Sequence, residues 1–287
     1  MSQVYLNGAF VSDGEARISV SDGGWLHGAG LFETMRAEHG RIFRLDAHLD
    51  RLRRSAWQIL RPIEPQALPD ESIFAELLER NLIRSARVRM TVSAGSLQNP
   101  TNVEGREPTV CITTAPLDSY PADLYEQGGQ IVVCNFKLST TDPIAGHKTT
   151  AYLPRLLGLR QARLAQCIEA LWFTNENHLA EGCMSNVFII RGNVLQTPPL
   201  DTPVLPGIAR SVVLEMAANA NVTVQECPLT IDDLLDADEV LLTNAIMQVM
   251  PVIRVEKHDI GAGRVGPMAK RLLEGYRKLV QTECAQL

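Results

Sequence analysis

Two side chains in the stretch 144–190 have the types and settings needed for chemistry on a carbonyl compound. Lys148 lies in a run from Pro143 to Pro154 that contains no other charged residue, histidine being counted as neutral. Burial of such a lysine lowers its pKa, so a neutral amine becomes available to form a Schiff base. Glu181 precedes a buried-looking strand, and a buried carboxylate can keep the ring nitrogen of a pyridine cofactor protonated. On the residues alone, a solvated surface lysine and a strand-end glutamate explain the pattern equally well.

Four motifs resemble the class IV aminotransferase family, in this order along the chain: HLDRLRRSA at 48–56, HKTTAYL at 147–153, AEGCMSNVF at 180–188 and LPGIAR at 205–210. This family of fold-type IV pyridoxal phosphate enzymes includes branched-chain aminotransferases, D-amino-acid aminotransferases and aminodeoxychorismate lyases. The resemblance covers nearly the whole chain. It implies an enzyme whose cofactor is pyridoxal 5′-phosphate, whose substrate is a small-molecule amine and whose assembly is a homodimer.

The resemblance also implies roles for single residues. Lys148 matches the catalytic lysine that holds the cofactor as a Schiff base and then moves a proton at the reacting carbon. Glu181 matches the carboxylate at the pyridine nitrogen, and Tyr152 matches a tyrosine that hydrogen-bonds the ring hydroxyl. Arg51 matches a phosphate contact, which a planar guanidinium suits, although a solvated helix face also explains this arginine. Asn186 is expected to support the site without touching the reacting atoms.

The remaining phosphate contacts are expected at a helix start and at a turn. A helix that begins after Gly207 presents the amides of Ile208 and Ala209 at its positive end, where phosphate binds readily. Relatives usually carry a threonine at the position of Ala209, so this chain lacks one hydroxyl but keeps the backbone donors. The turn at Asn244 completes the set. A Pro-Gly helix start without any ligand is the alternative.

The substrate is expected to contact the segment GGWLHGAGLFETMRA at 23–37. It matches the glycine-rich family segment that lines the substrate side of the active site, often that of the neighbouring subunit. The expected substrate contacts are Leu31, Glu33, Thr34 and Arg36. Without the resemblance, an ordinary sheet edge with glycines at its bends explains the same residues.

Two segments indicate which reaction the chain catalyses. TNAIMQVMPV at 243–252 resembles the corresponding turn of aminodeoxychorismate lyases, and GLFETMR at 30–36 is a common form in these lyases. The loop SAGSLQNP at 93–100 lacks the Arg-x-His pair of the best-known D-amino-acid aminotransferases. Arg36 also has a counterpart in branched-chain aminotransferases, so it does not distinguish the lyases from those aminotransferases. We therefore expect conversion of 4-amino-4-deoxychorismate to p-aminobenzoate and pyruvate, with a branched-chain or D-amino-acid aminotransferase as the alternative. Retention of the motif residues argues against a catalytically silent cofactor-binding protein.

The hydrophobic periodicity and the resemblance together predict a two-domain α+β and α/β chain. A small α+β domain is expected over 1–117, a linker over 118–130, and a larger cofactor-binding domain with a mixed sheet and flanking helices over 131–287. Asp46 is expected to cap a helix over 47–60.

Composition excludes several other classes of protein. A chain of 287 residues with 45% hydrophobic residues can bury one large core or two moderate ones. The net charge is −6 and the charges are interspersed, which argues against a nucleic-acid partner. The six cysteines form no CxxC or metal-ligand cluster, so no metal is expected and a reducing compartment is indicated. No apolar run spans a bilayer and the start of the chain lacks the pattern of a signal peptide, so we expect a cytoplasmic protein without a membrane partner.

Overall fold

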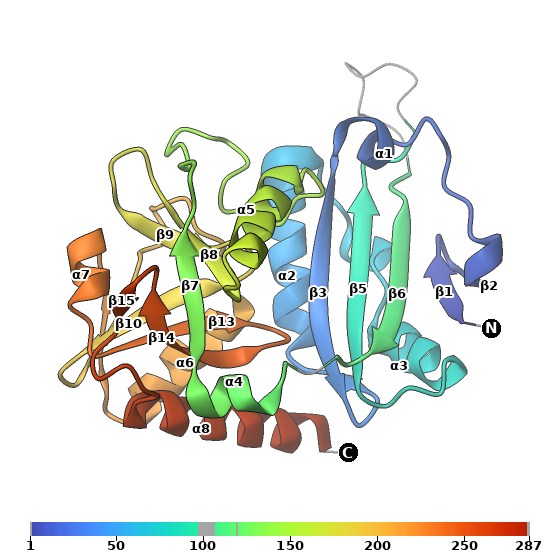
Figure 1. The fold of residues 1–287 in the computed structure, drawn as a ribbon. Helices are drawn as coiled ribbons and strands as arrows, with labels where there is room; N and C mark the ends of the chain where they lie inside the picture. The colour runs from blue at the N-terminus through green and yellow to red at the C-terminus, as the bar shows by residue number, and fades with distance from the viewer. Residues whose placement is uncertain (1, 97–106, 119, 286–287) are drawn as a thin grey trace. The chain divides into compact units, whose positions relative to one another are not determined.

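The computed structural model describes residues 2–96, 107–118 and 120–285, and the chain divides into two compact units (Figure 1). The first unit contains Met1–Asp118, His147–Tyr152 and Val280–Leu287, and the second contains Ser119–Gly146 and Leu153–Leu279. The segment that carries Lys148 thus belongs to the first unit, whereas the sequence analysis places it in 131–287. Of the loop at 93–100, which lacks an Arg-x-His pair, residues 97–100 lie outside the described residues.

The first unit is built on a six-stranded antiparallel sheet. Its strand order is β2-β1-β6-β5-β3-β4, and each neighbouring pair is antiparallel. The first hairpin, between β1 and β2, turns at Asn7 (φ 48°) and Gly8 (φ 92°), which adopt the positive φ angles of a tight Asn-Gly turn. The strands are β1 (Gln3–Leu6), β2 (Ala9–Ser12), β3 (Gly30–Glu38), β4 (Arg41–Ile42), β5 (Ala86–Ser93) and β6 (Val110–Pro116).

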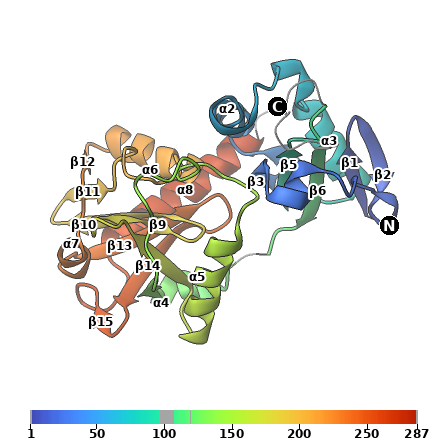
Figure 2. The same ribbon diagram turned by 90° about the horizontal axis from the view of Figure 1, so that it is seen from above.

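Two amphipathic helices cover one face of this sheet, as Figure 2 shows. Helix α2 (Leu45–Ser55), which continues as a π-helical segment (Ala56–Leu60), and helix α3 (Glu71–Arg80) supply the apolar side chains that pack on alternate residues of β3 and β5. The short α1 (Gly23–His27) precedes β3.

The predicted cap of α2 is wrong. The helix begins at Leu45 with Arg44 at the N-cap in the left-handed region (φ 55°), and Asp46 lies inside the first turn. The chain turns sharply out of β4 at Arg44, so the helix starts before the residue suited to cap it. A carboxylate in the first turn still interacts favourably with the positive helix end.

The second unit contains a nine-stranded mixed sheet, as the sequence predicts. Its order is β12-β11-β10-β13-β14-β7-β8-β9, with β15 paired to β14. The pairs β11·β12, β14·β7 and β7·β8 are parallel and the others are antiparallel. The strands are β7 (Gly129–Val133), β8 (Glu169–Phe173), β9 (Leu179–Gly182), β10 (Asn186–Arg191), β11 (Val194–Thr197), β12 (Thr223–Glu226), β13 (Glu239–Asn244), β14 (Gln248–Val255) and β15 (His258–Asp259).

Helices flank this sheet, and apolar clusters fill both of its faces. The helices are α4 (Ala122–Gln127), α5 (Leu153–Leu164), α6 (Ile208–Asn219), α7 (Ile231–Leu235) and α8 (Pro267–Ala285), the last of which ends in the first unit. Residues 118–130, expected to form a linker, include α4 and the start of β7. Among the described helices, none combines the length and the apolar character needed to cross a membrane.

Candidate active site

Backbone pairing with β3 positions Lys148. The amide of Phe32 donates to the Lys148 carbonyl at 2.9 Å, and the amide of Thr150 donates to the Gly30 carbonyl at 2.8 Å. A Cβ atom at Gly30 would lie 2.9 Å from the hydroxyl oxygen of Thr150, so only glycine allows this approach without displacing it. The Thr150 hydroxyl also donates to the carbonyl of Gly28 at 2.8 Å. Gly30, the first residue of β3, therefore allows the lysine segment to pair along the edge of this strand.

Polar groups of several residues surround the Phe32 ring, on the face of the six-stranded sheet opposite to the one that α2 and α3 cover; we call this set the Phe32 cluster. The Lys148 Nζ atom lies 4.6 Å from the centre of this ring, and the Arg89 guanidinium carbon lies 3.7 Å from it. The Tyr152 ring meets the same ring edge-on, with 5.3 Å between their centres. Thr34 pairs with Arg89 across β3 and β5 and lies on the same face. An amine, a guanidinium and a phenol thus surround one aromatic ring, and the Thr34 hydroxyl lies on the same face of the sheet.

The four expected substrate residues of β3 do not share one face of the sheet. Leu31 is 2% exposed and Glu33 is 1% exposed, and both lie on the helix-covered face. Thr34 and Arg36 lie on the opposite face, because strand side chains alternate. Arg36 also pairs with Glu38 at 2.6 Å on the same strand. Thr34 and Arg36 thus share the face of the Phe32 ring, and Thr34 is the one of the four that pairs with Arg89.

Glu33 instead forms a buried polar cluster with α2. Its carboxylate accepts from Arg51 Nε at 2.9 Å and from Arg51 Nη2 at 2.5 Å, and it contacts His48 Nδ1 at 2.7 Å. Burial raises the pKa of Glu33, but the Arg51 charge and the His48 hydrogen bond outweigh burial and lower it to about 2. Burial, together with the positive charges of Arg51 and Lys148, lowers the pKa of His48 despite its bond to Glu33. The motif HLDRL thus fixes Arg51 as half of a bidentate ion pair.

Replacement of Glu33 with glutamine is expected to lower the free energy of unfolding by about 3 kcal/mol at neutral pH, because it leaves a buried guanidinium without its carboxylate. The folded-state pKa of Glu33 lies below its unfolded value of 4.5, so its contribution is complete above pH 4.5 and is lost as the pH falls toward 2. Urea unfolding at several pH values measures both effects. Glu38→Gln, on the same strand but in a more exposed pair, should cost under about 1 kcal/mol.

In the second unit, Glu181 at β9 is 4% exposed and both of its carboxylate oxygens are bonded. Arg155 Nη2 donates to Oε1 at 2.5 Å. The amide of Leu205 donates to Oε2 at 2.9 Å, and Asn186 Nδ2 donates to the same oxygen at 3.3 Å. Asn186 Nδ2 also donates to the Leu205 carbonyl at 2.8 Å, so it ties Glu181 to the segment leading into α6. A carboxylate oxygen accepts more than one hydrogen bond, so this arrangement leaves acceptor capacity for a protonated ring nitrogen.

The start of α6 fits a phosphate group. Gly207 is the N-cap residue and no side chain caps the helix. A Cβ at Gly207 would overlap Asn186 Oδ1, so only glycine fits there. Thr243 pairs with Asn186 across β10 and β13, and its buried hydroxyl has no hydrogen-bond partner in the part of the chain that the structure describes. A helix end with backbone donors and a nearby buried hydroxyl matches the needs of an oxyanion.

Three of the expected phosphate residues lie in the second unit, at two places. Ile208 and Ala209 form the buried first turn of α6. Asn244 lies at the end of β13, where its side-chain oxygen accepts the amides of Ile246 at 2.9 Å and Met247 at 2.8 Å. The Asn244 side-chain oxygen therefore shapes the β13–β14 turn.

A second buried carboxylate holds the turn between Glu181 and Asn186. Glu169 is fully buried and accepts from the amides of Cys183 at 3.1 Å and Met184 at 3.3 Å, and from the Ser185 hydroxyl at 3.1 Å. Burial raises its pKa to about 7, although these hydrogen bonds oppose the rise. Sequence reasoning overlooked this residue because EALWF reads only as a buried strand.

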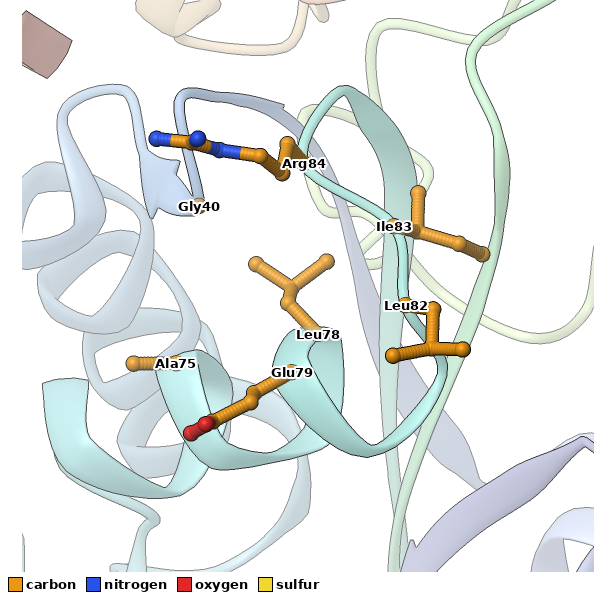
Figure 3. A pocket seen from close by; sticks show the side chains of 7 residues that line it. All are labelled: Gly40, Ala75, Leu78, Glu79, Leu82, Ile83 and Arg84. Carbon is orange, nitrogen blue, oxygen red and sulfur yellow. The ribbon is translucent and has the colours of Figure 1, made fainter.

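A hollow of about 480 Å³ lies in the first unit, and its lining contains none of the candidate site residues. Figure 3 shows the Arg84 guanidinium and the Glu79 carboxylate on opposite sides of it, with Leu78 between them. The lining residues are Gly40, Ala75, Leu78, Glu79, Leu82, Ile83 and Arg84. Among the described residues, no group of three or more His, Cys, Asp or Glu side chains could hold a metal ion.

Comparison with known proteins identifies the family of this chain. Residues 30–255 match the family model described as amino-transferase class IV. A putative branched-chain-amino-acid aminotransferase of Methanocaldococcus jannaschii is 32% identical over 96% of both chains. A D-alanine aminotransferase of Staphylococcus aureus is 28% identical over 98% of this chain and 99% of the relative. An aminodeoxychorismate lyase of Bacillus subtilis is 29% identical over 97% of this chain and 94% of the relative.

A solved structure agrees with these relatives. The T.th. branched-chain amino acid aminotransferase with pyridoxamine 5′-phosphate has a TM-score of 0.90 and 29% identity, over 98% of this chain and 94% of that chain. The chain therefore belongs to the amino-transferase class IV family. It is an enzyme that uses pyridoxal phosphate and acts on a small molecule.

Proposed function

We propose that Lys148 is the catalytic residue. It holds the cofactor covalently and afterwards carries a proton to or from the reacting carbon. The observation that supports this role is the position of its amine over the Phe32 ring, fixed by backbone pairing with β3. The bound cofactor supplies an electron sink for the carbon that loses its proton. Tyr152, which packs edge-on against Phe32, is assigned as the donor to the hydroxyl of the cofactor ring.

The other assignments rest on charge and donor chemistry. Glu181 is proposed to hold the proton of the ring nitrogen, and Asn186 keeps Glu181 in place through its bond to the same carboxylate. The phosphate is assigned to Arg51, to the amides of Ile208 and Ala209, and to the turn that Asn244 shapes. Thr243, whose buried hydroxyl lacks a partner in the described chain, is added to this set.

Substrate recognition is assigned to the Phe32 cluster. The Arg89 guanidinium suits a substrate carboxylate, because it is planar and permanently charged. Thr34 pairs with Arg89 across the strands and presents a hydroxyl on the same face. Amino acids and aminodeoxychorismate both carry a carboxylate, so this face does not separate the two candidate reactions. Leu31 and Glu33, on the covered face, support the strand from behind.

For the particular reaction, we propose cleavage of 4-amino-4-deoxychorismate to p-aminobenzoate and pyruvate. Lys148 removes the proton at C4, the bond from C3 to the enolpyruvyl oxygen breaks with its electron pair on the oxygen, and the released enolate takes up a proton at its CH₂ carbon to become pyruvate. The observation that carries this choice is the segment 243–252, whose Asn244 turn resembles that of the lyases. The Bacillus subtilis relative bears that activity in its name.

The alternative is transfer of an amino group from an amino acid to a keto acid, because the Methanocaldococcus and T.th. proteins are named as branched-chain aminotransferases. The lyase needs no amino acceptor, whereas the transferase cycle does. We expect the holoenzyme to release p-aminobenzoate and pyruvate from aminodeoxychorismate with no keto acid present. A parallel panel pairs L- and D-amino acids with 2-oxoglutarate or pyruvate. The lyase proposal is contradicted if no p-aminobenzoate forms while an amino acid bleaches the cofactor and a keto acid restores its colour. That outcome would establish the aminotransferase reaction.

We also propose that the chain works as a homodimer. Helix α5 leaves Leu153, Leu156, Leu157 and Leu164 between 46% and 75% exposed, and an apolar stripe of this kind marks an interaction surface. Sedimentation equilibrium should give twice the mass of 31.6 kDa, and Leu156→Glu should shift the protein toward the single-chain mass. If that variant remains a dimer, the interface does not lie on this face of α5.

A further inference from the structure

We infer that Arg155 is a positioning residue for Glu181, and that it acts on the cofactor only through that carboxylate. The inference rests on the proposed function of Glu181. No motif in the sequence pointed to Arg155, which stands three residues after Tyr152 in what reads as an ordinary helix start.

The contacts of Arg155 fix two consecutive residues of β9. Its Nη2 atom donates to Glu181 Oε1 at 2.5 Å, and its Nη1 atom donates to the Gly182 carbonyl at 2.8 Å. The guanidinium carbon also lies 5.0 Å from the Trp172 ring centre. The arginine is therefore held by a carboxylate, a carbonyl and an aromatic ring, which leaves its planar head little freedom.

The position of Arg155 in its helix disfavours a cation, so the contact with Glu181 is what explains an arginine there. It lies in the first turn of α5, where the positive end of the helix repels a cation, and that turn has no acidic residue. The Arg155 side chain is 19% exposed and the Glu181 side chain is 5% exposed, so solvent screens this pair only partly. The pair therefore offsets the cost of placing a carboxylate in a buried strand.

The two carboxylate oxygens of Glu181 therefore accept from different kinds of donor. The neutral donors of Asn186 and Leu205 hold Oε2, whereas the charged donor of Arg155 holds Oε1. The carboxylate plane is fixed by contacts on both sides. A ring nitrogen that binds Glu181 thus meets a preorganised acceptor whose charge is already shared with an arginine, and loss of Arg155 would let the carboxylate turn.

The test measures the dissociation constant of pyridoxal phosphate, together with the absorbance spectrum of the bound cofactor. It uses the wild type, Arg155→Met, Arg155→Lys, Glu181→Gln and the double variant Arg155→Met/Glu181→Gln. We expect Arg155→Met to weaken cofactor binding about tenfold, as loss of a group that supports a ligand commonly does, and to change the spectrum. Arg155→Lys should restore most of the affinity. Arg163→Met, in the last turn of the same helix, is the matched control and should bind like the wild type.

The double variant separates positioning from general structure. If Arg155 acts through Glu181, Arg155→Met should weaken binding no further once Glu181 is glutamine. A further tenfold loss in the double variant, or wild-type affinity and spectrum in Arg155→Met, overturns the inference while the proposed function stands. Wild-type affinity and spectrum in Glu181→Gln overturn the proposed function of Glu181 itself, and the inference with it.

Discussion

Replacement of Lys148 with alanine is expected to reduce turnover by about 10⁴-fold, the upper end of what a positioned acid–base group contributes. The backbone of Lys148 is held by its pairing with Phe32, which the side-chain change leaves intact. The fold should therefore survive, and the variant should still bind the cofactor without a covalent bond. Turnover and the visible absorbance of the purified protein measure the effect.

Chemical labelling locates the attachment directly. Borohydride reduction of the holoenzyme should leave the cofactor on the peptide that contains Lys148. Lys137 and Lys257 are the useful comparisons, because both are exposed lysines of the second unit. A label on either of them, with Lys148 unmodified, would contradict the assignment. Lys257→Ala is the matched variant and should turn over like the wild type.

The family was predictable because four ordered motifs indicate it, and the fold class was predictable because the periodicity of the apolar residues indicates strands and helices. The mixed sheet and the family are both confirmed. The pairing of Lys148 with β3 was not predictable, because it joins residues more than a hundred positions apart and no periodicity encodes such a contact. Glycines at 28 and 30 were the available signal, since a strand edge that begins with spaced glycines invites a close backbone approach.

The site residues that were missed share a physical cause. Arg89 alternates with apolar residues in β5, a pattern typical of a solvated face, and pairing with β3 is what brings it beside Phe32. Thr243 looks like an ordinary strand residue until its hydroxyl is found buried without a partner among the described residues. The resemblance gave Glu33 a place near the substrate, yet alternation along β3 turns it toward Arg51. Side-chain direction across a sheet depends on register, which tertiary pairing sets.

Replacement of Glu181 with glutamine is expected to lower turnover on the order of 10²–10³-fold, comparable with loss of one preorganised electrostatic group. The glutamine amide keeps the size of the side chain but removes the negative charge proposed to stabilise the protonated ring nitrogen. The structure adds a second consequence. Arg155 loses its charged partner and the backbone amide of Leu205 can face an NH₂ group in place of an oxygen, so the variant should also lose about 3 kcal/mol of stability.

The two consequences of Glu181→Gln must be measured apart. Turnover is followed with saturating pyridoxal phosphate, well below the unfolding temperature, and stability is followed by urea unfolding of the cofactor-free protein. Glu239→Gln is the matched control, because Glu239 is a buried carboxylate that holds the amides of Met268 and Ala269 at the start of α8. It should lose stability and keep its turnover. If Glu181→Gln behaves in the same way, with reduced stability and an unchanged rate, Glu181 is a structural strand-end residue and the ring nitrogen has another partner.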